Sequence, residues 1–376
     1  MKLLFYKWNS FMNEGVEKGL EQLNIAYDTF FFPLKDWEKD AEFIEVFTNK
    51  VKERVYDVVF SINYVPMISD ICEIIGIQYV AWVYDSPIHI KDISSLKNTC
   101  NKIYFFDRGQ VEKYRKDGIE ANYMSLAVDT YYWKRQIRKN KNKIFNADIS
   151  FVGQLYQTEY SYFLSPMDEY VRGFLEGIIN SQRKVYGAYL IPELVTGELL
   201  QRMNEQYAKV AVDGFQMGKR ELEFLLASEV TFRERYEILA LLAKHFQVHW
   251  YTSDNVEISN IKKHMYADYN TQMPVIFHNS KINLNISLKT IYTGIPLRAL
   301  DIMGCAGFLL SNYQVELAEY FVPGEECILY ESLGDMYEKC AYYLVNETER
   351  QKIALAGYEK VKRDFTFKEQ LAKMFI

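Results

Sequence analysis

The sequence predicts an α/β protein of two domains, each built on a parallel sheet that carries helices on both faces. The chain has 376 residues, which exceeds one ordinary core and suits two domains of about 150 to 200 residues each. Along most of the chain, short apolar strand-like runs alternate with amphipathic helix-like segments. Alternation of this kind is typical of parallel sheets, because each crossover between neighbouring strands needs a helix.

The first domain is expected to span residues 1–133, where runs rich in Val, Ile, Phe and Tyr predict strands. The expected strands are 2–6, 26–32, 57–61, 78–84, 102–106 and 122–126, and the expected helices are 11–23, 41–55, 67–75 and 109–116. Ligands of such sheets bind beyond the carboxyl ends of the strands. We therefore expect ligand contacts in the loops 7–11, 63–66, 85–89 and 127–130.

A basic run, KRQIRKNKNK, occupies residues 134–143. We interpret residues 134–146 as a solvated linker between the domains; the alternative is a surface that recruits anionic lipid. The whole chain has a net charge of −6, which argues against nucleic acid as a partner, because nucleic-acid-binding domains usually carry a basic surplus.

The second domain is expected to span residues 147–376. Its expected strands are 148–152, 247–251, 282–286, 308–310 and 327–329, and its expected helices are 296–303, 315–320, 334–345, 347–362 and 367–375. The helical stretch that follows the first of these strands is longer than one crossover needs, so we interpret about 160–226 as a helical insertion. Two roles stay open for it, namely stabilising the domain or a homodimer, and shaping the acceptor side of the site.

Several classes of protein are excluded by composition. No run of about 18 apolar residues occurs, so we expect no membrane span, and the N-terminus reads as a first strand rather than a signal peptide. The five cysteines have no C-x-x-C spacing, which indicates buried thiols in a reducing cytoplasm. We expect no metal site either, since the pair His245 and His249 crosses a predicted helix-to-strand boundary.

The segment 281–321, KINLNISLKTIYTGIPLRALDIMGCAGFLLSNYQVELAEYF, can hold a nucleotide diphosphate. A helix is expected to begin near Pro296 after the flexible Thr293-Gly294. Its free N–H groups and positive dipole end attract phosphate, and Lys289 and Arg298 add charge-assisted hydrogen bonds. Asp301, on the same helix face as Arg298, is suited to ribose hydroxyls. The alternative is an ordinary surface pair of Arg298 and Asp301.

The motifs KINLNIS, GIPLRALDIMGCAGFLLSN, FVPGEECILY and AGYEKVKRDFTFKEQL, with VYDSP, LAVDT and FVGQLY upstream, resemble family 4-like GT-B glycosyltransferases. The most similar branch is that of spore-maturation glycosyltransferases. The resemblance implies two Rossmann-like domains that face a cleft, with the last helix crossing back to the first domain. Asp301 stands where many members have Glu, and Ile291 to Thr293 occupy the place of the family's first acidic residue.

The resemblance implies a bacterial, cytoplasmic glycosyltransferase that uses a nucleotide-diphosphate sugar, with a UDP-sugar first among the candidates, and a surface glycan or glycoprotein as acceptor. No D-x-D tripeptide occurs in the chain, so neither a metal nor another cofactor is expected, and side-chain cations would stabilise the leaving diphosphate. Contact with the inner face of a membrane is expected to be peripheral at most. The alternatives are a sugar-nucleotide epimerase of the same fold and a non-catalytic nucleotide-sugar-binding scaffold.

These considerations give three groups of candidate residues. The candidate catalytic residues are Asp85, His89, Lys289 and Arg298. The candidate donor-binding residues are Gly153, Gln154, Tyr251, Thr252, Ser287, Lys289, Thr293, Gly294, Arg298, Asp301, Asn312 and Tyr313. The candidate acceptor-side residues are Asn9, Asn63, Tyr64, Asp85 and Ser86. Asp85 or His89 would take the acceptor proton if the anomeric centre is inverted; the alternative is that Asp85 only caps its own turn.

Overall fold

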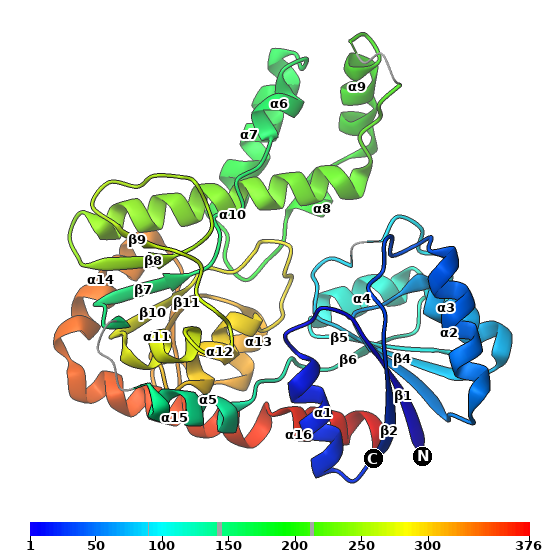
Figure 1. Cartoon of the computed structure of the whole chain (residues 1–376). Coiled ribbons are helices and arrows are strands. Elements are labelled where there is room, and N and C mark those ends of the chain that lie inside the picture. The colour runs from blue at the N-terminus through cyan, green and yellow to red at the C-terminus, as the bar shows by residue number, and fades with distance from the viewer. Residues whose placement is uncertain (89, 141–144, 211–213) are drawn as a thin grey trace. The chain divides into compact units, whose positions relative to one another are not determined.

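The computed structural model describes residues 1–88, 90–140, 145–210 and 214–376. These residues form two six-stranded sheets whose strand pairs are all parallel (Figure 1). The predicted α/β fold class is therefore confirmed. Each sheet belongs to one of two compact units. Unit 1 comprises Met1–Tyr132, Thr293–Leu300 and Glu359–Ile376, and unit 2 comprises Trp133–Tyr292 and Asp301–Tyr358.

Unit 1 contains a sheet in the order β2-β1-β3-β4-β5-β6. Its strands are β1 (Lys2–Lys7), β2 (Ala26–Phe31), β3 (Val58–Ile62), β4 (Gln78–Val83), β5 (Asn101–Phe105) and β6 (Ala121–Tyr123). The elements between them are α1 (Asn13–Gln22), α2 (Ala41–Glu53), α3 (Pro66–Ile75), the 3₁₀ turn η1 (Ser94–Lys97) and α4 (Arg108–Lys116). All six strands were predicted from the sequence, with ends that differ by at most a few residues.

Both faces of this sheet are covered, as the continuous apolar runs require. Along β1, Leu4 and Tyr6 enter one buried cluster, whereas Leu3 and Phe5 enter another on the opposite face. The second cluster also contains residues of α16 (Phe367–Phe375), the last helix of the chain, which packs against α1. The C-terminal helix is thus part of unit 1.

Unit 2 contains a sheet in the order β12-β11-β10-β7-β8-β9. Its strands are β7 (Ile149–Val152), β8 (Val248–Tyr251), β9 (Lys262–His264), β10 (Ile282–Asn285), β11 (Leu309–Asn312) and β12 (Ile328–Tyr330). The helices that follow the sheet strands are α11 (Met273–Asn279), α12 (Leu297–Gly304), α13 (Val315–Tyr320), α14 (Leu333–Val345) and α15 (Glu347–Asp364). Residues 297–300 of α12 and 359–364 of α15 belong to unit 1. The sequence did not predict β9 or α11.

The helical insertion lies between β7 and β8. It consists of α6 (Tyr160–Leu164), α7 (Glu169–Arg183), α8 (Ile191–Leu194), α9 (Gly197–Tyr207) and the first part of α10 (Lys219–Ala243). In Figure 1 its helices α6, α7 and α9 extend from one side of α10, and they share a buried cluster with α8 and the first part of α10. The expected end of the insertion at residue 226 lies inside α10, which continues without a break into the helix that covers the sheet.

The segment predicted as a linker is partly helical, because α5 spans Thr130–Lys139. Trp133 and Ile137, four residues apart, lie on the less exposed side of this helix. Of the predicted linker, residues 141–144 lie outside the described residues. All five cysteines are free thiols. Within the described ranges, no helix combines the length and the apolar character needed to cross a membrane.

Candidate functional site

The loops that follow β7, β8, β10 and β11 form the candidate site of unit 2. All these strands are parallel, so their carboxyl ends meet at one edge of the sheet, where such folds bind ligands. The predicted donor residues Gly153 and Gln154 follow β7, and Thr252 follows β8. The Gln154 side-chain amide donates to Ser253 Oγ at 3.1 Å, and the Leu155 N–H donates to Asp254 Oδ2 at 2.6 Å. The β7 and β8 loops are therefore tied to each other.

Arg235 of α10 holds two of these loops in place. The residue is 8% exposed. Its Nε donates to the Ile286 carbonyl at 3.0 Å, and one terminal nitrogen donates to the Gln154 carbonyl. The guanidinium lies 4.9 Å from the ring centroid of Tyr156. A planar guanidinium suits this role, because it donates in several fixed directions at once. Arg235 was not predicted from the sequence.

Lys289 and Glu234 form a buried ion pair in the same region. Lys289 Nζ lies 2.9 Å from Glu234 Oε2, and the two side chains are 7% and 3% exposed. The ammonium also lies 4.7 Å from the ring centroid of Tyr186, and the Lys289 N–H donates to Thr231 Oγ1 at 3.1 Å. Burial, and next the charge of Glu234, raise the pKa of the Tyr186 hydroxyl. We expected the Lys289 ammonium to be available for a diphosphate, whereas in this structure it is already paired with the Glu234 carboxylate.

The predicted residues Ser287 and Asn312 are hydrogen-bonded to each other. Asn312 Oδ1 accepts from the Ser287 N–H at 2.8 Å, and Asn285 Nδ2 donates to Ser287 Oγ at 3.1 Å and to Ser311 Oγ at 2.9 Å. All four side chains are buried. This polar network satisfies buried groups at the ends of β10 and β11 and fixes the backbone of the two loops.

The insertion contributes directly to the site through the loop between α7 and α8. Gly187 has a positive φ of 74°, and a Cβ there would lie 2.6 Å from the Tyr313 ring. Glycine is needed at this position for both reasons. Since Tyr186 lies beside Lys289 and Gly187 rests on Tyr313, part of the insertion shapes the donor-side loops. A role in an acceptor contact or in a dimer stays a prediction.

Asp301 occupies a different environment from the one expected for a ribose ligand. It is 1% exposed, and its Oδ1 accepts from the Tyr269 hydroxyl at 2.8 Å. The Tyr269 ring in turn packs edge-on against Trp133, with 6.0 Å between the centroids. Because the carboxylate is buried, a pair of Arg298 and Asp301 would not lie at the surface, and the role of Asp301 as a ribose ligand stays a prediction.

Thr293, Gly294 and Arg298 belong to unit 1. The Thr293 N–H and hydroxyl both donate to Asp107 Oδ1, at 3.1 and 3.0 Å. A Cβ on Gly294 would lie 2.9 Å from the Phe106 carbonyl oxygen, so this segment approaches the end of β5 at backbone distance. We expected Thr293 to offer a cap for the following helix, whereas its side-chain hydroxyl donates a hydrogen bond to Asp107. Arg298 lies in the first turn of α12 and is partly buried.

Among the acceptor-side candidates, the structure brings Asn63 and Asp85 together. Asn63 Nδ2 donates to Asp85 Oδ2 at 2.7 Å, and Asn63 Oδ1 accepts from the Tyr84 N–H at 2.7 Å. Asn63 has a φ of 60°, a conformation that asparagine tolerates better than most residues. The Asp85 carboxylate is exposed and is thus oriented by Asn63 at the carboxyl end of β4.

The other candidates of unit 1 are not part of this pair. Tyr64 is buried and donates to Ser95 Oγ at 3.0 Å, so it belongs to the core. Ser86 is hydrogen-bonded to the side-chain amide of Gln110, and Asn9 is exposed after β1. His89 lies outside the described residues.

Tyr251, at the end of β8, stacks on His264 with 4.5 Å between the ring centroids. Burial raises the pKa of Tyr251 to about 12, which keeps its hydroxyl neutral. His264 Nε2 lies 3.2 Å from His249 Nδ1, whereas His245 packs on Tyr337. His245 and His249 therefore face different neighbours, and the described residues contain no group of three or more potential metal ligands.

We expect the burial of His249 beside His264 to make the free energy of unfolding fall as the pH drops. Burial, and next the charge of His264, lower the pKa of His249 to about 4, against 6.5 for the unperturbed group. Between these values the unfolded chain binds more protons than the folded one, so the stabilisation is complete above pH 6.5 and is lost towards pH 4. Between pH 7 and pH 5, wild type should lose about 2 kcal/mol more than His249→Gln in urea unfolding. Parallel pH profiles would contradict this assignment.

The comparisons with known proteins agree with this architecture. The chain has the fold of the GT-B glycosyltransferases. Residues 222–375 match the model of a family described as glycosyl transferase-like. Spore protein CgeB of Bacillus subtilis (strain 168) is 35% identical over 77 residues, which span 20% of this chain and 23% of that protein.

Three solved structures illustrate the likeness in fold. HepE of Anabaena in complex with UDP and glucose has a TM-score of 0.52 at 10% identity and covers 100% of this chain and 99% of its own. Sucrose-phosphate synthase of Thermosynechococcus elongatus has a TM-score of 0.59 at 9% identity, and the match covers 100% of this chain and 98% of that chain. UDP-forming α,α-trehalose-phosphate synthase of Burkholderia xenovorans has a TM-score of 0.54 at 11% identity, and the match covers 99% of this chain and 97% of that chain.

Proposed function

We propose that this chain is a glycosyltransferase that takes a sugar from a nucleotide-diphosphate sugar, with a UDP-sugar as the first candidate. The observation that carries the proposal is the glycosyl transferase-like match over residues 222–375, because this range contains most of α10 and the loops after β8, β10 and β11. Structures of the similarly folded HepE contain UDP, UDP with glucose, or UDP-glucose. A nucleoside diphosphate is therefore the leaving group to test.

The proposed chemistry is electrostatic. As the bond between sugar and phosphate breaks, negative charge grows on the departing diphosphate, and preorganised cations and N–H groups lower the energy of that charge. Arg298 and the N–H groups at the start of α12 are the proposed donors. Lys289 would join them only if a phosphate competes with Glu234 for its ammonium. We propose that these groups act without a metal or another cofactor, which agrees with the lack of a D-x-D tripeptide in the sequence.

For the acceptor we propose a bacterial surface glycan or surface glycoprotein, glycosylated in the cytoplasm. Asp85 is the proposed base for an inverting transfer, because its exposed carboxylate is oriented by Asn63 at 2.7 Å and a base must lie within hydrogen-bond reach of the proton it takes. Asp85→Asn should then lower the turnover number by a factor of about 10² to 10⁴ with little change in donor affinity. An unchanged turnover number would leave Asp85 a turn-capping role.

Two observations favour a non-catalytic nucleotide-sugar-binding scaffold as the second candidate. Lys289 is already paired with Glu234, and Asp301 already accepts from Tyr269, so two predicted donor contacts are engaged inside the protein. A scaffold would bind the nucleotide sugar tightly and neither transfer nor hydrolyse it. Conversion of the sugar nucleotide without any acceptor would instead identify an epimerase.

We expect one of UDP, GDP, dTDP and CDP to raise the thermal unfolding midpoint of the protein in EDTA. A ligand at 100 times its dissociation constant adds about 2.7 kcal/mol to the free energy of unfolding. Arg298→Ala should lose most of this response, because it removes a proposed phosphate contact. Arg220→Ala is the matched control, since Arg220 is an exposed arginine of α10 and should respond like wild type.

The outcomes of this experiment separate the proposals. If none of the four nucleotides changes the midpoint, the donor-site assignment is wrong. If one does so only when Mg²⁺ is added, the metal-independent mechanism is wrong, and the donor site stands.

A further inference from the structure

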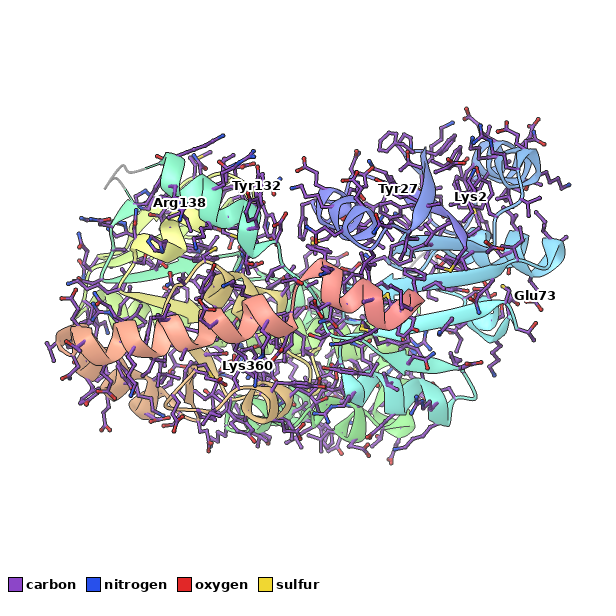
Figure 2. All side chains as sticks on the ribbon, turned by 90° about the horizontal axis from the view of Figure 1, so that it is seen from below. Lys2, Tyr27, Glu73, Tyr132, Arg138 and Lys360 are labelled. Carbon is purple, nitrogen blue, oxygen red and sulfur yellow. The ribbon has the colours of Figure 1, made fainter. Side chains whose placement is uncertain are left out.

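Helix α5 carries four cations on one face. Lys134, Arg135, Arg138 and Lys139 are all exposed, and their spacing places them within an arc of about 140° around the helix axis. Trp133, on another side of the helix, is 2% exposed and packs on Tyr269. We call these four residues the basic face of α5; Arg138 can be located on α5 in Figure 2. The basic face lies entirely in unit 2.

No acidic side chain of the described residues neutralises the basic face. Among the residues that the structure describes, none forms an ion pair or a side-chain hydrogen bond with any of its four members. Some other surface cations of unit 2 do have acidic partners. Lys281 lies 2.8 Å from Asp148, and Lys339 lies 2.8 Å from Asp335. Four adjacent like charges repel one another, and a helix that keeps them unpaired is suited to an anionic partner.

We propose that the basic face of α5 binds anionic phospholipid at a membrane surface. Each Lys or Arg close to such a surface contributes on the order of 1 kcal/mol, and clusters of four or more on an amphipathic helix are typical of this interaction. The net charge of the whole chain is −6, so the rest of the protein is repelled by the same lipid. Binding is therefore local, oriented and peripheral.

Nucleic acid is less suited to this face. Single strands are held by cations together with exposed aromatic rings on which bases stack. Helix α5 carries one strongly exposed ring, that of Tyr131, which is 80% exposed, whereas Trp133 is 2% exposed. Stacking of successive bases needs several such rings, whereas a lipid surface needs only charge, which the basic face supplies.

The test is co-sedimentation of the full chain with vesicles. The vesicles consist of phosphatidylcholine alone or with about 30% phosphatidylglycerol, and the buffers contain about 0.05 M or about 0.5 M salt. The first variant carries Lys134→Gln, Arg135→Gln, Arg138→Gln and Lys139→Gln. The matched control carries Lys184→Gln, Lys209→Gln, Arg220→Gln and Lys244→Gln, which removes four exposed cations of unit 2 from separate places. Circular dichroism and thermal melting establish that both variants are folded.

We expect wild type and control to bind the anionic vesicles at low salt, with loss of binding at high salt and on neutral vesicles. The partition coefficient of the basic-face variant between anionic vesicles and buffer should be lower by a factor of at least about a hundred. Equal binding of both variants, or binding of wild type to neutral vesicles, would overturn the proposal. So would wild type that binds poly(U) RNA and no vesicles. Neither vesicles nor membrane charge enter the nucleotide experiment, so the two proposals can fail separately.

Discussion

Replacing Lys289 by methionine should lower the free energy of unfolding by about 3 to 5 kcal/mol. The cause is the Glu234 carboxylate, which stays buried in the variant without the charge of Lys289. Glu234 is 3% exposed, and a buried carboxylate without a counter-charge costs far more than a missing contact. Urea or thermal unfolding of the purified variant measures the loss. A loss below about 1 kcal/mol would mean that water or another side chain reaches Glu234 when the lysine is removed.

The double variant Lys289→Met with Glu234→Leu is the control that separates stability from binding. Replacing both members of a buried ion pair by apolar residues of similar size is often close to neutral. We therefore expect the double variant to be more stable than either single variant, with a coupling energy of about 2 kcal/mol or more. If the folded double variant still responds to a nucleotide like wild type, Lys289 is a structural residue. If its response is lost, the lysine also contacts the phosphates.

The fold could be predicted because strands and helices leave periodic apolar patterns. Leu3 to Tyr6 are apolar without interruption and form a strand buried on both faces, as expected in a parallel sheet. The strand β9, with the sequence KKH, has no such pattern, because it lies at an edge of its sheet. Its pairing with β8 depends on backbone hydrogen bonds, which any residue but proline can make.

Helix α5 was missed for a related reason. Five of its last six residues are Lys, Arg or Gln, which is typical of a solvated segment, and Trp133 and Ile137 supply its less exposed apolar side. Two apolar residues four apart are a weak signal among many polar ones.

The pairing of site residues could be predicted only in part. The loops that carry Gly153, Thr252 and Ser287 could be located, because ligand loops follow the strands. The partner of Thr293 could not be found, because Asp107 lies 186 residues away in the sequence and neither residue has a motif that indicates the other.

A signal for Glu234 did exist. Ala227, Val230, Glu234 and Ile238 follow one another at helical spacing, and all four are buried. A charged residue at a position where the 3.6-residue period requires an apolar one predicts a buried partner of opposite charge. It does not say which lysine or arginine that partner is.

Gly15→Ala should destabilise the protein by about 2 kcal/mol, although alanine favours helices over glycine by about 1 kcal/mol. Gly15 lies in α1, where a Cβ would be 2.2 Å from Cε2 of Phe367 in α16. The Phe367 ring cannot move aside freely, because it also packs edge-on against Trp82 at 6.1 Å. The added methyl group must therefore push α16 away from α1, and the buried contacts between the two helices weaken.

Gly177→Ala is the matched control for this prediction. Gly177 lies within α7, and a Cβ there would meet nothing within 4 Å, so the same substitution should stabilise the protein by about 0.5 to 1 kcal/mol. Opposite signs for the two variants in thermal unfolding would show that close packing decides the effect at Gly15. Equal stabilisation by both would mean that α16 does not pack against α1 in solution. The last helix would then be free of the unit whose second buried cluster contains Phe367 and Leu371.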